Sequence, residues 1–228
     1  MIEEVVPSKV ASAELLGDPE GLRLFPEEEA AVSRAVANRR REFTTVRHCA
    51  RQALATLGHP AVPLVPDEHR APVWPDGIVG SMTHCTGYRA AAVAHRTDIT
   101  AIGLDAEPDA ALPGEVLGRV ATSAERRALG QLADSPGQPH WDRLLFSAKE
   151  SVYKAWFPLM RTWLGFEDAA IEIDPAAGTF RACILNHRKA ADVGEVTETG
   201  ECAPKEFRGR WIARDGLIIT AIARSATS

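Results

Sequence analysis

The sequence of 228 residues lacks the features that mark several common classes of protein. No apolar run approaches the ~20 residues that a membrane-spanning helix requires. The four cysteines (Cys49, Cys85, Cys183 and Cys202) are scattered without a CxxC pair, which argues against a structural zinc site and against a disulfide framework. Because the acidic N-terminus also lacks a signal-peptide pattern, we expect a cytoplasmic protein with reduced thiols and no contact with a membrane.

The chain also lacks a net positive charge. The net charge is −5, so no overall basic field attracts nucleic acid, and any site for anions must be local. Hydrophobic residues make up 45% of the chain, which is enough for one large domain or two small ones with a packed core.

Hydrophobic periodicity predicts a mixture of helices and strands. Residues 27–57 have apolar side chains at helical spacing. Residues 78–107 predict a β-meander. A long helix is expected from Trp141 towards Phe157, where Pro158 bends or interrupts it. Further predicted elements are short helices in 112–120 and 123–132, a loop over 135–139, and strands over 169–173, 179–185, 207–214 and 216–224.

Two segments of the chain resemble each other: "AHRTDITAI" (94–102) and "ARDGLIITAI" (213–222). Each reads as the end of a strand, a turn that contains aspartate, and a strand with Ile-Thr-Ala-Ile. The likeness is either a coincidence among β-prone residues or the trace of a duplicated α/β unit. If it is a duplication, the copies have diverged, because only the first strand continues into Asp105 and Glu107.

The "GLDAEP" segment places two carboxylates close together. Asp105 and Glu107 are two residues apart on a predicted strand, so they project from the same side with Cα atoms roughly 6–7 Å apart. Such carboxylates repel each other unless a cation lies between them, and Mg²⁺ prefers hard oxygen ligands of this kind. The alternative is an exposed strand end with two solvated acids.

The "FSAKESVYKAW" segment (146–156) carries charge among aromatic residues. Glu150 and Lys154 lie on the same side of the predicted helix, at the edge of its buried stripe, and Lys149 lies still closer to the apolar face. Desolvated charges need partners, which a metal could provide for Glu150 and an anion for the lysines. The alternative is an exposed ion pair that contributes only about 0.3–0.5 kcal/mol.

A basic helix face precedes these motifs. Arg40, Arg47 and Arg51 share one face of the first predicted helix, with Arg39 nearby, and guanidinium groups suit phosphate oxygens. The alternative is a solvated basic face.

Thr83 and His84 end a predicted strand before a glycine turn, and both side chains could donate to a phosphate. A lone histidine is more often structural. Taken together, however, the motifs describe a Mg²⁺ site of three carboxylates beside several phosphate-binding groups.

"GLDAEP" followed by "FSAKESVYKAW" resembles the signature pair of the 4′-phosphopantetheinyl transferases. The segments "RREFTTVRHCAR", "RAPVWPDGIVGSMTHC" and "WLGFEDA" resemble the bacterial enterobactin-type or actinobacterial branch of that family. The resemblance covers roughly residues 35–175.

The resemblance implies an α+β fold of two similar α/β halves, residues 1–104 and 105–228, related by a pseudo-twofold with the active site between them. The implied activity transfers the phosphopantetheine arm of coenzyme A to a serine of an apo acyl or peptidyl carrier protein and releases adenosine 3′,5′-bisphosphate. The partners would serve fatty-acid, polyketide or nonribosomal-peptide synthases. A monomer is expected.

The resemblance also implies roles for individual residues. Asp105, Glu107 and Glu150 would hold Mg²⁺, or Mn²⁺, against the coenzyme A diphosphate. Glu150 would also be the base for the carrier serine. Lys154 would neutralise the diphosphate and assist departure of the bisphosphate. The other implied coenzyme A contacts are Lys149, Thr83 and His84, with Arg39, Arg47 and Arg70 at the 3′-phosphate.

Residues 112–127, with Arg119, Arg126 and Arg127, could dock an acidic carrier protein or could form a solvated helix. Two other functions remain open. A metal-dependent nuclease or phosphodiesterase would normally place its lysine two residues after an acid on a strand and would require a basic groove. A non-catalytic nucleotide-binding module would not require three carboxylates.

Overall fold

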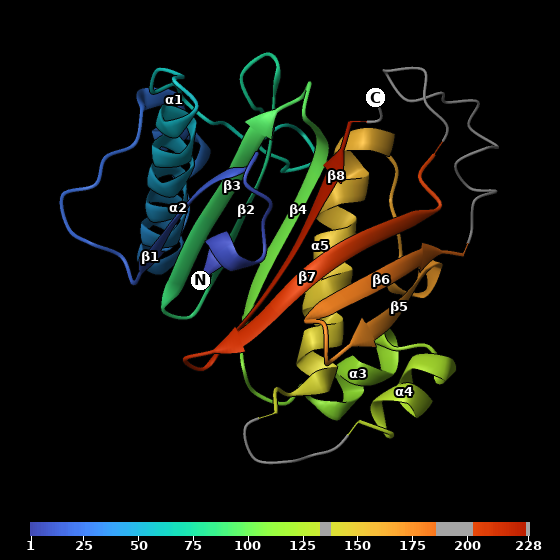
Figure 1. Cartoon of the computed structure of the whole chain (residues 1–228). Helices are drawn as coiled ribbons and strands as arrows, with labels where there is room; N and C mark the ends of the chain where they lie inside the picture. The colour runs from blue at the N-terminus through green and yellow to red at the C-terminus, as the bar shows by residue number, and fades with distance from the viewer. Residues whose placement is uncertain (133–137, 186–202, 227–228) are drawn as a thin grey trace.

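The computed structural model describes residues 1–132, 138–185 and 203–226. Helices and antiparallel strands combine in one molecule, which confirms the predicted α+β class (Figure 1). In the part that is described, no helix is both long enough and apolar enough to cross a membrane. Cys49, Cys85 and Cys183 are free thiols, while Cys202 and the first residues of the predicted 135–139 loop lie outside the described residues.

The smaller sheet has the order β1-β3-β2. β2 and β3 form the predicted hairpin, with Cys85 opposite Tyr88 across the turn. β1 lies on the other side of β3, in a segment where no strand or helix was predicted. Helix α2 covers one face of this sheet (Figure 1). The bounds are Ala11–Leu16 for β1, Ile78–Cys85 for β2, Tyr88–His95 for β3 and Ala37–Thr56 for α2.

The larger sheet has the order β4-β8-β7-β6-β5, and helix α5 packs on β4 and β8 (Figure 1). The strands of the C-terminal region confirm the predicted ones. Their bounds are Ile99–Pro108 for β4, Ala169–Asp174 for β5, Thr179–Ile184 for β6, Glu206–Arg214 for β7 and Leu217–Ser225 for β8, and α5 spans Trp141–Met160.

The predicted β-meander over 78–107 is wrong in one respect: β4 pairs with β8 rather than with β3. On its other edge, β4 lies beside β2, and side chains take the place of a backbone ladder. The amide of Leu104 donates to the hydroxyl of Ser81, and the amide of Ala106 donates to Thr83, both at 3.0 Å. The two sheets are therefore joined at β2 and β4, and a division between residues 104 and 105 would fall inside β4.

The single helix expected over 27–57 is in fact two helices. The short helix α1 spans Pro26–Ala31, and the chain bends before α2 begins at Ala37. The buried Glu28 accounts for the break, because its carboxylate accepts hydrogen bonds from Arg51 and from the amide of Leu64. These bonds hold α1 beside α2 instead of in line with it.

Helix α5 does not stop at Phe157 but passes through Pro158 to Met160. It approaches β4 very closely at Gly103, where a Cβ atom would lie 1.9 Å from the carbonyl oxygen of Ser151. Only glycine permits this contact, which brings the middle of α5 directly onto β4. The two short predicted helices are also present, as α3 (Gly114–Val120) and α4 (Ser123–Leu129).

Candidate active site

Asp105 lies where β2, β4 and α5 meet. It is buried, and Lys154 from α5 donates to its Oδ1 at 2.7 Å. The hydroxyl of Ser147 donates to Oδ2 at 2.9 Å, and the hydroxyl of Thr83 lies 3.3 Å from Oδ1. These donors hold the buried carboxylate of Asp105 in one fixed orientation.

Lys154 does not form the exposed ion pair with Glu150 that was the alternative to an active-site role. Its ammonium group donates to Asp105 and, at 2.9 Å, to the carbonyl oxygen of Leu104. No ion pair joins Glu150 to Lys154 in the described structure. The lysine is thus directed at the strand that carries the two acids, as the active-site interpretation requires.

A buried cluster of hydroxyl groups supports this arrangement. Thr220 of β8 is paired with Asp105 in the sheet, and its hydroxyl lies 2.9 Å from that of Ser147 and 2.6 Å from that of Ser151. Ser147, Ser151 and Thr220 were not predicted from the sequence as parts of the site. Their signal was the presence of small polar side chains, four residues apart, within the apolar stripe of α5.

Glu107 lies beside Asp105 at the end of β4. Arg143 of α5 donates to its carboxylate at 2.9 Å. Burial and the charge of Asp105 nevertheless raise the pKa of Glu107, although Arg143 and Lys154 oppose this shift. The sequence analysis also missed Arg143, which the fold brings to the acid from the first turns of α5.

Glu150 is half-buried and lines a cavity together with Lys154 and Tyr153. Burial is the main cause that raises its pKa, the charge of Asp105 adds to the effect, and Lys154 opposes it. Within the part of the chain described, its carboxylate makes no hydrogen bond and no ion pair. A carboxylate with a raised pKa, free of partners and facing a cavity, has the properties of a general base.

The three acids fit a divalent cation in their chemistry. Asp105 raises the pKa of both Glu107 and Glu150, so the two glutamates lie close enough to feel its charge. Three carboxylates offer the hard oxygen ligands that Mg²⁺ prefers, and a cation among them would relieve their repulsion. The side chains of the described residues do not converge into a closed group of three metal ligands, and Lys154 and Arg143 form ion pairs with Asp105 and Glu107 instead.

Lys149 lies elsewhere, and the structure does not support its predicted contact with phosphate. It is buried, and its three protons are used by the carboxylate of Glu125 at 2.9 Å and by the carbonyl oxygens of Val120 and Phe166. Burial lowers the pKa of Lys149, while Glu125 opposes the shift. This lysine ties α5 to the α3–α4 segment and is a structural residue.

The cavity beside Glu150 has a volume of about 740 Å³ and lies between the two halves of the molecule. The N-terminal half contributes the segment from Asp67 to Met82, including Arg70, and the C-terminal half contributes Glu150 and the last turns of α5. Arg96 also lines it, at the turn before β4, and the sequence analysis did not select it. A cavity of this size can hold a nucleotide-sized ligand.

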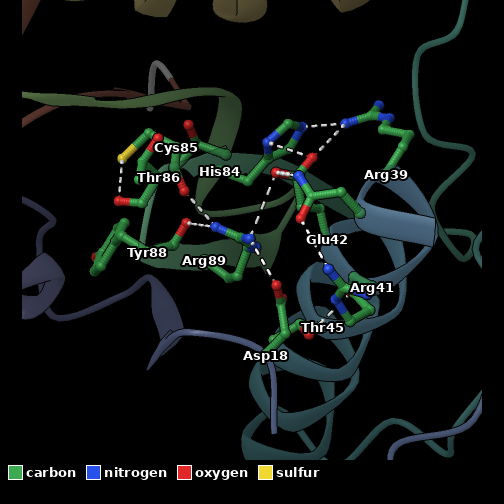
Figure 2. A network of polar contacts seen from close by, with 12 residues as sticks. Asp18, Arg39, Arg41, Glu42, Thr45, His84, Cys85, Thr86, Tyr88 and Arg89 are labelled. Carbon is green, nitrogen blue, oxygen red and sulfur yellow. Dashed lines mark hydrogen bonds and ion pairs between the residues drawn. The ribbon is translucent and has the colours of Figure 1, made fainter. Parts of the chain in front are cut away.

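His84 and Arg39 form a second basic site, at the end of β2 and the start of α2 (Figure 2). The imidazole Nε2 contacts the Arg39 guanidinium, and its Nδ1 lies 3.7 Å from Glu42. Burial, followed by the charge of Arg39, lowers the pKa of His84. Because a guanidinium can only donate, Nε2 of His84 accepts from Arg39, and the N–H of the neutral ring lies on Nδ1, towards Glu42.

A buried arginine supports this second site. Figure 2 shows Arg89 of β3 between Asp18, Glu42 and the end of β2. Its guanidinium donates to both carboxylate oxygens of Asp18, at 3.0 and 2.8 Å, and lies 3.5 Å from Glu42. The network fixes Glu42 and, through it, the surroundings of His84.

The arginines of the predicted basic face of α2 have different partners. Arg40 and Arg51 are paired with the α1 carboxylates Glu29 and Glu28. Arg47 has no carboxylate within ion-pair distance among the described residues: its Nε donates to the carbonyl oxygen of Leu64, and burial lowers its pKa to about 9.

Thr83, predicted to hold a phosphate, is buried, and its hydroxyl instead contacts Asp105 and the amide of Ala106.

The sequence was compared with known protein families and with individual proteins. Residues 27–94 match the 4′-phosphopantetheinyl transferase N-terminal domain, and residues 101–207 match the 4′-phosphopantetheinyl transferase superfamily. The first match ends in β3 and the second begins in β4.

Three relatives are similar over nearly their whole length. The chain is 50% identical to the 4′-phosphopantetheinyl transferase Svp of Streptomyces mobaraensis, over 99% of this chain and 90% of the relative. It is 49% identical to Npt of Nocardia iowensis, over 98% and 99%, and 44% identical to PptT of Mycobacterium tuberculosis, over 97% of each. The chain belongs to the 4′-phosphopantetheinyl transferase superfamily.

Proposed function

We propose that this chain transfers the 4′-phosphopantetheine arm of coenzyme A to a serine of an apo acyl or peptidyl carrier protein, with adenosine 3′,5′-bisphosphate as the other product. Enzymes of this family use coenzyme A and a divalent metal ion and modify carrier proteins. The observation that carries the proposal is Glu150: an unpaired carboxylate with a raised pKa beside the Asp105–Lys154 pair, facing a cavity between the halves.

Glu150 is proposed as the general base. The carrier serine must lose its proton as its oxygen attacks the phosphorus atom, and a carboxylate whose pKa is raised accepts that proton more readily than an ordinary one. Its lack of protein partners leaves its oxygens available to the serine or to a water molecule between them. The bond from phosphorus to the bisphosphate oxygen breaks as the new bond to serine forms.

Lys154 is proposed to stabilise the negative charge that develops on the departing bisphosphate. Its ammonium group is already held by Asp105 and by the carbonyl oxygen of Leu104. A cation fixed before the reaction stabilises the transition state without paying for reorganisation. Because phosphoryl transfer requires little covalent chemistry from the protein, such positioning is the main contribution expected of it.

Asp105, Glu107 and Glu150 are proposed to hold a divalent ion, Mg²⁺ in preference to Mn²⁺. The ion would neutralise the diphosphate of coenzyme A. Burial and, after it, the charge of Asp105 raise the pKa of both glutamates, and a cation among the three acids would relieve the repulsion between them.

Arg39 and His84, with Arg47 and Arg70, are proposed to bind the nucleotide phosphates. The Arg39 guanidinium is half-exposed beside His84 and is accessible to an anion. Arg47 is a buried cation without a carboxylate partner in the described structure, so a phosphate would stabilise it. The α3–α4 segment, with Arg119, Arg126 and Arg127, remains the proposed dock for an acidic carrier.

The test is to incubate the protein with coenzyme A, Mg²⁺ and an apo-carrier protein and to measure the intact mass of the carrier. The proposal predicts a mass increase of one phosphopantetheine arm on the carrier serine, and none when that serine is replaced by alanine. A carrier that stays unmodified while a known transferase modifies it under the same conditions would refute the proposal. Cleavage of a nucleic acid or phosphodiester instead would support the hydrolase alternative.

A further inference from the structure

A tight turn over residues 66–72 projects from the N-terminal half towards α5. Its two ends are bridged between Pro66 and Pro72. Inside it, Oδ1 of Asp67 accepts hydrogen bonds from the amides of His69 at 2.9 Å and Ala71 at 2.8 Å. One carboxylate oxygen thus holds the shape of the turn.

The second oxygen of Asp67 fastens this turn to the other half of the molecule. Arg161, the C-cap residue that follows α5, donates from Nη1 to Oδ2 of Asp67 at 2.9 Å. The ring of His69 also lies edge-on against Phe157, one turn earlier on α5, with ring centroids 5.4 Å apart. The turn therefore rests on the last turns of the helix that carries Glu150 and Lys154.

Arg70 is exposed in this turn, as are Glu68 and His69. Its backbone is left-handed, with φ of 67°, a conformation that an arginine adopts only where its surroundings hold it there. Arg161, at the other end of the ion pair, is also left-handed, with φ of 52°. Arg70 lines the cavity with Glu150 and Lys154, and its guanidinium has no hydrogen bond or ion pair in the described part of the chain.

We propose that Asp67 and Arg161 are positioning residues for the coenzyme A site. Their ion pair holds the turn of the N-terminal half against α5 and so keeps the Arg70 guanidinium at the cavity, where it meets an anionic group of the bound coenzyme. The inference rests on the proposed function, because it takes coenzyme A as the ligand. Asp67 and Arg161 contribute to coenzyme affinity and take no part in the chemical step.

The experiment measures KM and kcat for coenzyme A in Asp67→Ala, Arg161→Ala and Arg70→Ala. Each of the first two should raise KM about three- to ten-fold, as expected when one charge-assisted hydrogen bond and the order that it imposes are lost, with little change in kcat. Adding Arg70→Ala to either variant should raise KM little further, because the displaced turn no longer presents Arg70.

Two further variants make the result specific. Asp67→Asn keeps the acceptor inside the turn but removes the charge that binds Arg161, so it should raise KM less than Asp67→Ala and still above wild type. Arg214→Ala breaks the ion pair of Arg214 with Glu4, at 2.6 Å, which also joins distant segments and has an arginine of similar exposure, 46% against 51%. This control should leave KM unchanged.

Unchanged KM in both Arg161→Ala and Asp67→Asn would overturn the inference, as would a fully additive effect of Arg70→Ala. A wild-type protein that modifies carriers normally would leave the proposed function intact in that case. If wild-type protein bound coenzyme A without modifying any carrier, the proposed function would fail, and the same pattern in the Kd for coenzyme A would still support the positioning role. Absence of coenzyme A binding would overturn both.

Discussion

Lys149 and Lys154 lie on the same helix and carry the same charge, yet their surroundings give them different roles. The side chain of Lys149 is 1% exposed and is enclosed by Glu125 and two carbonyl oxygens. The side chain of Lys154 is 28% exposed and lies between Asp105 and the cavity. Lys149 stabilises the docking of α5 against the α3–α4 segment, whereas Lys154 is available to a ligand.

The position of a charged residue within a sequence motif therefore does not determine its role. Both lysines belong to "FSAKESVYKAW", and both were expected to contact phosphate. A cation whose three protons are all used inside the protein has none left to offer an anion. The two sides of α5 can therefore be separated by experiment.

The largest effect is expected on the cavity side, at Glu150. Glu150→Gln should abolish transfer while the protein remains folded, because the amide can neither accept the serine proton nor provide a charged metal ligand. The measurement is turnover on an apo-carrier, with circular dichroism as the folding control. Retention of even a tenth of wild-type turnover would remove Glu150 from both roles.

On the enclosed side of α5, Lys149→Ala should lower the free energy of unfolding. It leaves Glu125 as a buried carboxylate without its cation, and breaking such a pair costs about 3–5 kcal/mol of unfolding free energy. Denaturant unfolding measures this loss. The double variant Lys149→Met with Glu125→Gln should recover part of it, since no unpaired buried charge remains. Wild-type stability in Lys149→Ala would show that the enclosed pair is not structural.

Lys154→Ala should slow the chemical step of transfer. Loss of one preorganised electrostatic donor lowers kcat by about 10²–10³, and KM for coenzyme A should change less, because the interaction strengthens in the transition state. Lys154→Arg should rescue only partly, since a planar fork does not reproduce a point charge. Steady-state kinetics of the three proteins decide this. A normal kcat in the alanine variant would place Lys154 outside the reaction.

Arg47 extends the comparison to the nucleotide end of the site. Its pKa of about 9 leaves it charged at pH 7, buried and without a carboxylate partner in the described structure. Arg47→Ala should weaken binding of coenzyme A by about 1.5–3 kcal/mol, and binding of dephospho-coenzyme A by less. Titration calorimetry with both ligands tests the assignment to the 3′-phosphate. Arg40→Ala, which breaks only the pair with Glu29, is the matched control.

The smallest effect concerns pH and the metal. Glu107 and Glu150 have folded pKa values above those of ordinary glutamates, so they retain protons at pH values where the unfolded chain has lost them. Stability of the metal-free protein should therefore fall as pH rises through that window. Mg²⁺ competes with these protons and should stabilise more at pH 7 than at pH 5, by about 1 kcal/mol or about 2–4 °C in Tm. An equal shift at both pH values would contradict the metal assignment.

Local patterns in the sequence predicted most of the elements. The strands β2, β3 and β4 together span Ile78 to Pro108, close to the β-structure predicted over 78–107, because strand-forming residues and turn residues act over a few neighbours. The partner of β4 could not be predicted in this way. It depends on β8, more than a hundred positions away, and on two hydroxyl groups that take the place of a backbone ladder.

The same distinction holds for the site. Asp105 and Lys154 were identified from their motifs, and the fold pairs them directly. Ser147, Thr220 and Arg143 were missed, because their roles exist only once α5 lies across the sheet. The break before α2 was missed for a related reason: the periodicity continues through it, and only the burial of Glu28 shows why the helix ends there.

The most direct test compares the two lysines in one measurement: the single-turnover rate of transfer from coenzyme A to an apo-carrier, with enzyme in excess and at a temperature where every variant is folded. We expect Lys154→Ala to slow this rate by about 10²–10³-fold and Lys149→Ala to stay near the wild-type rate. A rate that falls in Lys149→Ala as far as in Lys154→Ala, with both proteins folded, would contradict the assignment of chemistry to the Glu150–Lys154 side of the helix.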